Sequence, residues 1–497
     1  MPYPALPSVT QRSMYPVDSK NADAIGYGSR ALNSVATTAE HVKTIFHDSD
    51  RHTKAKNNDA GWMMGQVLGQ CVGLLSGDEW TSLRRHLSQP FSRKSVREFF
   101  PIMHSHTQRY LHDLRKSKTG NVKELREGRG EQKEREETIT IHPAQDLKLL
   151  PFSLVAVLLY GKVLDDEDLS QQLYAMVPLR ERLFMHVIGG GITRYWWSSL
   201  FTWTEANRLL RRFQQDWLEF NQRCYEKAKQ LGLCVPIVGL WEGVVSGEID
   251  RTQVVTSVNL PLKKANLLMP PLQLLQSLDE VLFANLDVTT GALSWLIVNM
   301  ASSPSAQARL LAEIRSKVGC IDRPPDDDAL TTLWEYIDSS GTFLASCVVE
   351  SARVRPVAAF SIPQAPPTDR VVGGYRIPAR TSVVVDAYAL NIRDPFWGED
   401  GARFRPERWE GMSNKTGQAT RYQMWRFGFG PRVCMGQHIA EKMMRVALVL
   451  LVGEYEFKLS ESPSRRKGDK GEGGDMETSP ESWITTPNVL VECQSRE

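Results

Sequence analysis

One cysteine in this 497-residue chain lies in a glycine-rich bend that leads directly into an apolar helical pattern. The segment reads Phe427-Gly428-Phe429-Gly430-Pro431-Arg432-Val433-Cys434-Met435-Gly436. Because glycine permits positive φ and tight turns, the bend can hold the Cys434 sulfur at a fixed point. Backbone N–H groups in such a bend, and the start of the helix that follows, favour the thiolate, which is the metal-binding form of cysteine.

The neighbours of Cys434 indicate what the thiolate binds. Arg432 adds a guanidinium suited to pair with a carboxylate such as a haem propionate. Phe427 can shield the sulfur from water, and the polarity around a metal ligand tunes its redox potential. No Cys-x-x-Cys or His-x-x-x-His pattern stands nearby in the sequence, which argues against zinc and iron–sulfur ligation. A single thiolate that ligates haem iron fits best.

The spacing Phe427-x-x-Gly430-x-Arg432-x-Cys434-x-Gly436 resembles the haem-binding signature of the cytochrome P450 family. The resemblance implies heme b with Cys434 as the axial iron ligand, and it assigns Phe427, Arg432 and Gly436 to the cofactor site. A buried structural cysteine beside a glycine turn is the alternative. Further motifs in the family's order argue against it.

A charged triad is the second resemblance. Glu350 and Arg353 stand at i and i+3, so they can pair on one helix face. The segment Phe404-Arg405-Pro406-Glu407-Arg408-Trp409 resembles the place where an arginine, here Arg408, joins that pair. We expect these three residues to be structural, because a buried charge network is strongly destabilised when one member is removed. A solvated ion pair is the alternative.

A third resemblance lies in Trp80-Thr81-Ser82-Leu83-Arg84, which is similar to the family's helix that touches a haem propionate. Trp80 and Arg84, at i and i+4, share one helix face and are expected to bind the cofactor. Family members often carry a propionate-binding arginine further along the chain. Pro363 and Gln364 stand near that place instead, which puts one expected charge contact in doubt.

The oxygen chemistry is expected in the long apolar segment 272–300. Within it stands Phe283-Ala284-Asn285-Leu286-Asp287-Val288-Thr289-Thr290, where the family places an acid and an alcohol that relay protons. Asp287 and Thr289 are the expected catalytic pair, since acid and hydroxyl suit that relay.

This stretch departs from the family pattern twice. Asn285 stands where glycine is usual, and Val288 occupies the alcohol position. Either Thr289 acts one residue late, or the register slips and Thr290 takes the role. A threonine that only bonds its i−4 carbonyl is the third interpretation.

The elements that position these residues are mainly helical. Helical periodicity covers about 90–117, 144–161, 165–185, 204–231, 272–303, 306–318 and 436–452, and the runs 370–378 and 381–385 predict a hairpin. With the resemblance, the fold class is mainly α with small β-sheets, a cytochrome P450 fold in a single large domain around a buried haem. We expect a short N-terminal lead without membrane anchor over 1–44, the haem-thiolate monooxygenase domain over 45–490, and solvated charged loops at 118–136 and 462–480.

The composition of the chain limits the kinds of partner that the protein is expected to bind. Sixty Lys and Arg nearly balance 58 Asp and Glu, for a formal net charge of +2, which is no nucleic-acid signature. Seven scattered cysteines favour a reducing compartment over a disulfide framework. No dinucleotide-binding Gly-x-Gly-x-x-Gly with its strand–helix context is present, so electrons are expected from an NADPH–cytochrome P450 reductase.

The resemblance to the family implies a location at the cytoplasmic face of the endoplasmic reticulum membrane. Without an anchor, a cytoplasmic or peripheral location is the alternative.

The expected substrate is a small but bulky apolar molecule. The family's substrate-contacting segments map to about 52–70, 176–200, 279–290, 357–362 and 483–487, where aromatic and methionine side chains offer an adaptable apolar wall. The block Trp196–Trp203 could instead contact a membrane surface. The runs 287–290 and 422–427 resemble fungal secondary-metabolite members, with those that tailor diketopiperazines or other amino-acid-derived toxins nearest. Two other hypotheses stay open. The protein is either a peroxide-driven or isomerase-type haem-thiolate enzyme, or an inactive haem-binding paralogue.

Overall fold

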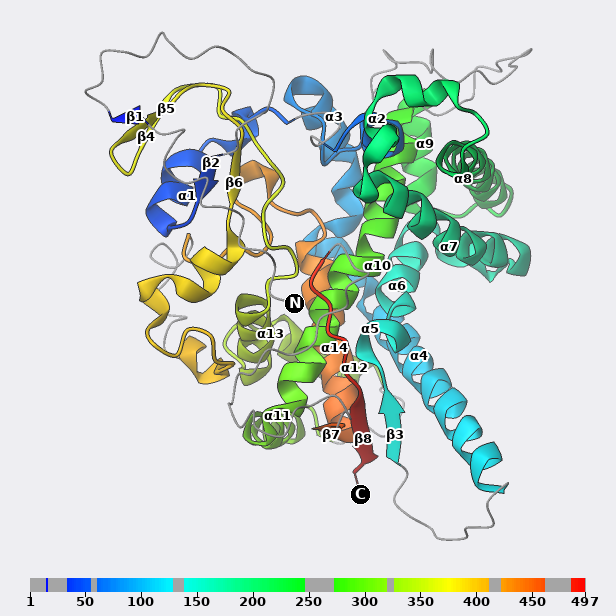
Figure 1. Ribbon diagram of the computed structural model, residues 1–497. Coiled ribbons are helices and arrows are strands. Elements are labelled where there is room, and N and C mark those ends of the chain that lie inside the picture. Colours follow the sequence, from blue (N-terminus) through cyan, green and yellow to red (C-terminus); the bar gives the residue numbers. More distant parts are fainter. Residues whose placement is uncertain are drawn as a thin grey trace.

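Helix α10 (Leu272–Ala301) runs through the middle of the molecule (Figure 1). It packs against α6 (Leu149–Tyr160), α13 (Phe343–Val354) and α5 (Pro143–Asp146). Its sequence is apolar on nearly every side, so a buried position is the stable one. The computed structural model describes residues 15–16, 34–54, 60–127, 138–245, 272–319, 326–410, 422–460 and 484–496.

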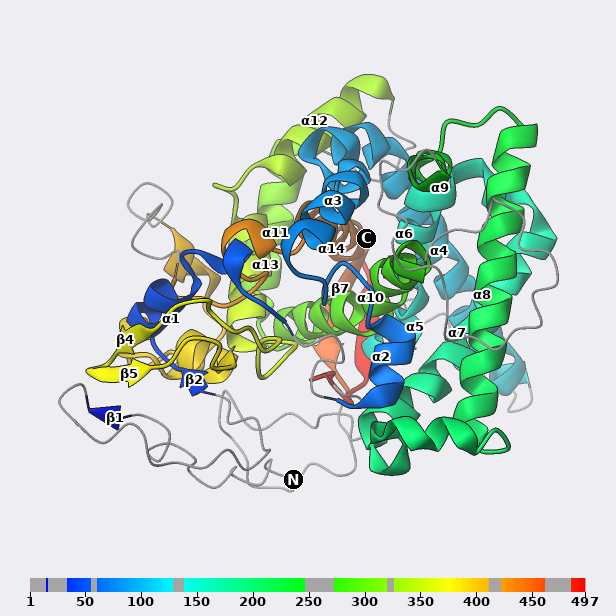
Figure 2. The same cartoon turned by 90° about the horizontal axis from the view of Figure 1, so that it is seen from above.

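The remaining helices surround α10 and confirm the predicted mainly helical fold in one large domain. In chain order they are α1 (Ala39–Phe46), α2 (Trp62–Leu68), α3 (Gly77–Leu87), α4 (Arg93–Glu127), α7 (Glu167–Gly189), α8 (Glu205–Gln230), α9 (Pro236–Val245), α11 (Pro304–Lys317), α12 (Asp327–Asp338) and α14 (Gln437–Glu454). Helices α7 and α8 pack on each other along one side, opposite the strands β2 (Ser34–Ala36), β4 (Arg370–Val372) and β5 (Tyr375–Ile377) (Figure 2).

Three small sheets complete the described fold. One has the order β1 (Tyr15–Pro16), β5 (Tyr375–Ile377), β4 (Arg370–Val372); a second pairs β2 (Ser34–Ala36) with β6 (Val383–Val385); the third has the order β3 (Thr138–Ile141), β8 (Val491–Ser495), β7 (Tyr455–Leu459). The second pair is parallel and the other pairings are antiparallel.

The hairpin prediction was wrong in its register. The turn lies inside the first run, at Gly373 and Gly374, whose φ values are 57° and 81°. Two adjacent residues with positive φ are what a tight two-residue hairpin requires. The second run forms β6, which pairs with β2 instead.

The charged segment 118–136 was predicted as a loop, and this is wrong for its first ten residues because α4 continues to Glu127. Lys, Arg and Glu have high helix propensity, so a charged, solvated stretch can still extend a helix. Residues 128–136, the segment 462–480 and residue 483, the first of the substrate-contacting segment 483–487, lie outside the described residues.

Two helical stretches in the described part of the chain are long and apolar enough to cross a membrane. They are Pro143–Asp165 and Leu272–Ala301, and 67% of each apolar window is buried inside the protein. Both belong to the core around α10.

Candidate active site

The bend that carries Cys434 joins a short 3₁₀ turn, Gly430–Arg432, to helix α14. The Cys434 N–H donates to Phe427 O at 2.8 Å, which closes the bend. Gly428 and Gly430 have φ values of 84° and 68°, a region that favours glycine. A Cβ atom on Gly430 would also lie 2.3 Å from Ser49 Oγ. Conformation and space therefore both require glycine here.

The Cys434 sulfur experiences opposing effects. Its side chain keeps accessible surface, yet burial raises the pKa of the thiol, against the backbone N–H groups of Gly436 and Gln437 and the charge of Arg84, which lower it. Burial has the larger effect, so the pKa of the Cys434 thiol is raised overall. The backbone donors favour the thiolate as expected, but they do not outweigh the effect of burial. A metal cation at the sulfur would supply the stabilisation that the thiolate needs, since coordination deprotonates a thiol.

Two arginines and a tryptophan meet beside this bend. Arg84 on α3 donates from Nη2 to Val433 O at 2.6 Å, and Arg432 donates from Nη2 to Leu75 O at 2.9 Å. The Arg432 guanidinium carbon lies 4.4 Å from the centroid of the Trp80 ring. Trp80 and Arg84 thus both reach the bend from α3, as their spacing predicted.

These cations are suited to a bound anion. Burial and then the charge of Arg84 lower the pKa of Arg432 to about 10, and burial lowers the pKa of Arg84 as well. Arg432 Nε is buried and has no hydrogen-bond partner. An unpaired buried donor is costly, and neighbouring cations repel one another. A group with carboxylates, as haem has in its two propionates, would relieve both costs, so the residues present fit haem.

Lys54 and Glu280 belong to the same cluster, and the sequence did not single them out. Lys54 donates from Nζ to Gly73 O at 2.8 Å, and Glu280 Oε2 on α10 accepts the Gly73 N–H at 2.9 Å. The charge of Glu280 acts on Lys54, Arg84 and Cys434. The sequence could have indicated Glu280 as a site residue, because a carboxylate in so apolar a helix needs a partner. Lys54 carried none.

The middle of α10 presents a partly accessible face. Ala284 is exposed and Asp287 and Val288 are half-buried, whereas Thr289 and Thr290 are buried. Glu280, Ala284 and Asp287 stand on one helix face by their spacing. Since the charge of Glu280 acts on Cys434, this is the face of α10 on the Cys434 side.

The two candidate relay alcohols have different partners. Thr289 Oγ1 donates to Asn285 Oδ1 at 2.7 Å, and Asn285 Nδ2 donates to Val281 O at 3.1 Å. Thr290 Oγ1 donates to Lys148 O at 3.2 Å, on another segment. Thr289 therefore bonds the side chain of its i−4 neighbour and not the carbonyl, and Asn285 links it to the partly accessible face.

Glu350, Arg353 and Arg408 lie together in the interior. Arg353 makes a bidentate pair with Glu350, with N–O distances of 2.7 and 2.8 Å, and Arg408 Nε lies 3.4 Å from Glu350 Oε1. Trp409 Nε1 donates to Glu350 Oε2 at 2.9 Å, and Asp400 Oδ1 lies 3.0 Å from Arg408 Nη2. Glu350 and Arg353 side chains are fully buried, so the arrangement is not a solvated surface pair.

Phe427 and Gly436 flank the bend at its two ends. The Phe427 carbonyl accepts the Cys434 N–H, and its ring lies 4.6 Å from the Arg426 guanidinium carbon. Gly436 is the N-cap residue of α14, and a Cβ there would lie 3.8 Å from Cys434 Sγ.

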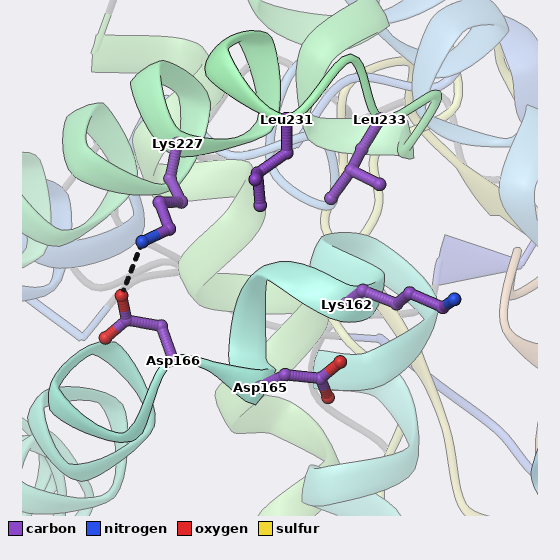
Figure 3. Close-up of a pocket in the computed structure, with 6 residues that line it drawn as sticks. All are labelled: Lys162, Asp165, Asp166, Lys227, Leu231 and Leu233. Carbon is purple, nitrogen blue, oxygen red and sulfur yellow. Dashed lines mark hydrogen bonds and ion pairs between the residues drawn. The ribbon is translucent and has the colours of Figure 1, made fainter.

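Several side chains predicted to line a substrate pocket belong to the core. Phe283 is buried against Phe213 and Trp217, with ring centroids 5.7 and 5.5 Å away. Met63 and Met64 are buried too. A separate surface pocket, drawn in Figure 3, is lined by residues such as Lys162 and Leu231 and contains the Lys227–Asp166 ion pair at 2.9 Å. None of the predicted site residues lines it.

Comparison with known proteins agrees with this geometry. Residues 28–482 match the cytochrome P450 family. The chain is 40% identical over 462 residues to cytochrome P450 monooxygenase asaD of Aspergillus flavus, covering 93% of this chain and 78% of that protein. It is also 40% identical over 462 residues to cytochrome P450 monooxygenase aclC of Aspergillus oryzae, covering 93% and 82% of the two chains. Cytochrome P450 monooxygenase gliC of Aspergillus fumigatus is 36% identical over 463 residues, covering 92% and 80%.

The chain belongs to the cytochrome P450 family. It is an oxygenase, with relatives among fungal secondary-metabolite monooxygenases, and the family binds haem through an axial cysteine thiolate. The family resemblance predicted from the sequence is confirmed.

Proposed function

We propose that this enzyme inserts one oxygen atom of O2 into a bulky, apolar, amino-acid-derived secondary metabolite of the diketopiperazine or mycotoxin type. The substrate C–H becomes C–OH, the second oxygen atom leaves as water, and NADPH supplies two electrons through a reductase. The relatives in Aspergillus species support the reaction class. The resemblance of segments 287–290 and 422–427 to fungal secondary-metabolite members supports the substrate class.

Cys434 is the proposed axial ligand, and this assignment carries the proposal. Its bend is closed by the Phe427 carbonyl, and two backbone N–H groups act on its sulfur. Bound haem would supply the activation of dioxygen, which an axial thiolate favours by donating electron density. Arg84, Arg432 and Trp80 would hold the propionates, while Phe427 and Gly436 fix the bend.

Asp287 and Thr289 are the proposed proton donors. Asp287 lies on the partly accessible face of α10, and Thr289 is connected to that face through Asn285 at 2.7 Å. The Asn285 amide, itself held by the Val281 carbonyl, therefore orients the Thr289 hydroxyl that would donate the proton. Thr290 is the weaker candidate, because its hydroxyl donates to the Lys148 carbonyl.

A peroxide-driven or isomerase-type haem-thiolate activity is the second candidate. Val288 lies on the partly accessible face, where an alcohol would suit the relay, and Thr289 is buried behind it. An inactive haem-binding paralogue is the third reading.

We also propose a peripheral membrane contact, at the cytoplasmic face of the endoplasmic reticulum. Trp196, Leu200 and Trp203 are 69%, 66% and 67% exposed. They lie in and after a short 3₁₀ helix, Trp196–Leu200, between α7 and α8. Exposed tryptophans favour a lipid–water interface.

The test is an assay of the purified protein with NADPH, a cytochrome P450 reductase and candidate diketopiperazines. Carbon monoxide difference spectra measure the haem-thiolate content in parallel. We expect product that requires NADPH, reductase and O2 together. Product formed with peroxide alone would favour the second candidate, and a correct spectrum without turnover under either condition would favour the third.

A further inference from the structure

Lys54 lies on a short extended segment that pairs with residue 365. Thr53 and Ala365 exchange both backbone hydrogen bonds, Thr53 N to Ala365 O at 3.0 Å and Ala365 N to Thr53 O at 2.9 Å. In this antiparallel bridge, the residue after Thr53 stands opposite the residue before Ala365. Lys54 and Gln364 are therefore cross-strand neighbours on one face.

The half-buried Lys54 amine has one hydrogen-bond acceptor among the described residues. It donates to Gly73 O at 2.8 Å, and an ammonium carries three donors. Among ion pairs between described side chains, none joins Lys54 to Glu280 within 4.0 Å. Burial and then the charge of Arg432 lower the pKa of Lys54 to about 8. Among the described residues, the amine thus experiences the charge of two other cations and has no contacting carboxylate.

Positive charge is in excess in this part of the structure. The charges of Arg84 and Arg432 act on Lys54, and the charge of Arg84 acts on Arg432. Glu280 is the half-buried carboxylate whose charge acts on Lys54 and Arg84. Asp50, which acts on Arg432, is exposed and screened by solvent. Among the described residues, three cations around one half-buried carboxylate leave a surplus of positive charge that a dianion would neutralise.

We propose that Lys54 is a third cation for the haem carboxylates, beside Arg84 and Arg432, and that it supplies the charge that its neighbour Gln364 does not. This inference rests on the proposed haem-thiolate function. Lys54 is a positioning residue: it orients and retains the cofactor and does not touch the reacting atoms.

Four variants of the holoenzyme test the proposal: Lys54→Gln, Lys54→Arg, the double variant Lys54→Gln/Gln364→Arg, and the control Lys43→Gln on the exposed side of α1. The measurements are the rate of haem transfer to excess apomyoglobin and the ferric/ferrous midpoint potential. We expect Lys54→Gln to lose haem about 10- to 100-fold faster, the scale of a hydrogen bond to a charged group, and to have a lower potential. Lys54→Arg and the control should resemble the wild type, and the double variant should recover most of the loss.

The role of Lys54 and the proposed haem-thiolate function can be tested separately with these variants. Every variant should keep the thiolate-type carbon monoxide spectrum, because Cys434 is unchanged. Unaltered haem loss and potential in Lys54→Gln would overturn the role of Lys54 alone. So would equal haem loss in Lys54→Arg and Lys54→Gln, since the charge would then be irrelevant. If Lys54→Gln retains no haem on purification, the double variant decides: recovered haem supports the proposal, and none contradicts it.

Discussion

The hydroxyl of Thr289 donates to Asn285 Oδ1 at 2.7 Å, one turn earlier on α10. Asn285 stands where the family resemblance predicts glycine, and Val288 where it predicts the alcohol. The two departures are therefore connected. The Asn285 side chain accepts the hydrogen bond of the Thr289 hydroxyl, which stands one position after the place of the family's alcohol.

Thr289→Ala should uncouple the enzyme. If Thr289 and Asp287 deliver protons, the proton-transfer step should slow by about 10²–10⁴-fold, while NADPH and O2 are still consumed. The measurement is product and peroxide formed per NADPH oxidised. Asn285→Ala should uncouple as well, because it removes the hydrogen-bond acceptor of Thr289.

Thr290→Ala is the matched control for this experiment, because Thr290 donates to Lys148 O instead. Its coupling should stay near that of the wild type. Full coupling in Thr289→Ala, Asn285→Ala and Asp287→Ala together would eliminate the relay and raise the isomerase-type candidate.

Glu350→Ala should destabilise the protein by about 3–5 kcal/mol, the usual cost of stranding a buried charge. Two arginines and the Trp409 N–H would lose their common acceptor. We expect little soluble holoenzyme and a lowered thermal midpoint, measured by circular dichroism and haem content. A variant with wild-type haem content and midpoint would show that the triad is dispensable.

The buried pair Arg180–Asp279 should make stability depend on pH. Arg180 on α7 lies 2.8 Å from Asp279 on α10, and burial raises the pKa of Asp279 from 3.8 to about 6 in spite of Arg180. The folded protein therefore holds the Asp279 proton more tightly than the unfolded chain does. Its contribution to stability is complete below pH 4 and is lost as pH rises to about 6, by about 3 kcal/mol in all.

Asp279→Asn should remove this dependence, because the amide does not titrate. Thermal midpoints at several values between pH 4 and pH 7 measure it, with Asp216→Asn as the control, since Asp216 pairs with Arg212 at the surface. Identical pH profiles for Asp279→Asn and the wild type would refute the assignment.

Local sequence predicted the parts of the site that depend on local structure. The Cys434 bend needs glycine at 428 and 430, and Trp80 and Arg84 need only helical spacing to share a face. Glu350 and Arg353 pair within one turn. In each case the physical requirement lies within a few neighbouring residues, so the sequence pattern contains it.

Contacts between distant segments could not be predicted in the same way. Lys54 and Glu280 meet at Gly73 because α10 and the segment after α2 pack together, and nothing in the residues near Lys54 specifies that. The register of β6 depends on β2, about 350 residues earlier in the chain. The helical extension of α4 was missed because charged residues were interpreted by their solvation and not by their helix propensity.

The central claim is that Cys434 supplies the axial thiolate, and the carbon monoxide difference spectrum of Cys434→Ala tests it most directly. Cys234→Ala, which removes an exposed free cysteine, is the control. The account predicts that Cys434→Ala loses the red-shifted, thiolate-type Soret band of the reduced carbon monoxide complex, while Cys234→Ala keeps it. A Cys434→Ala protein that retained that band would contradict the account.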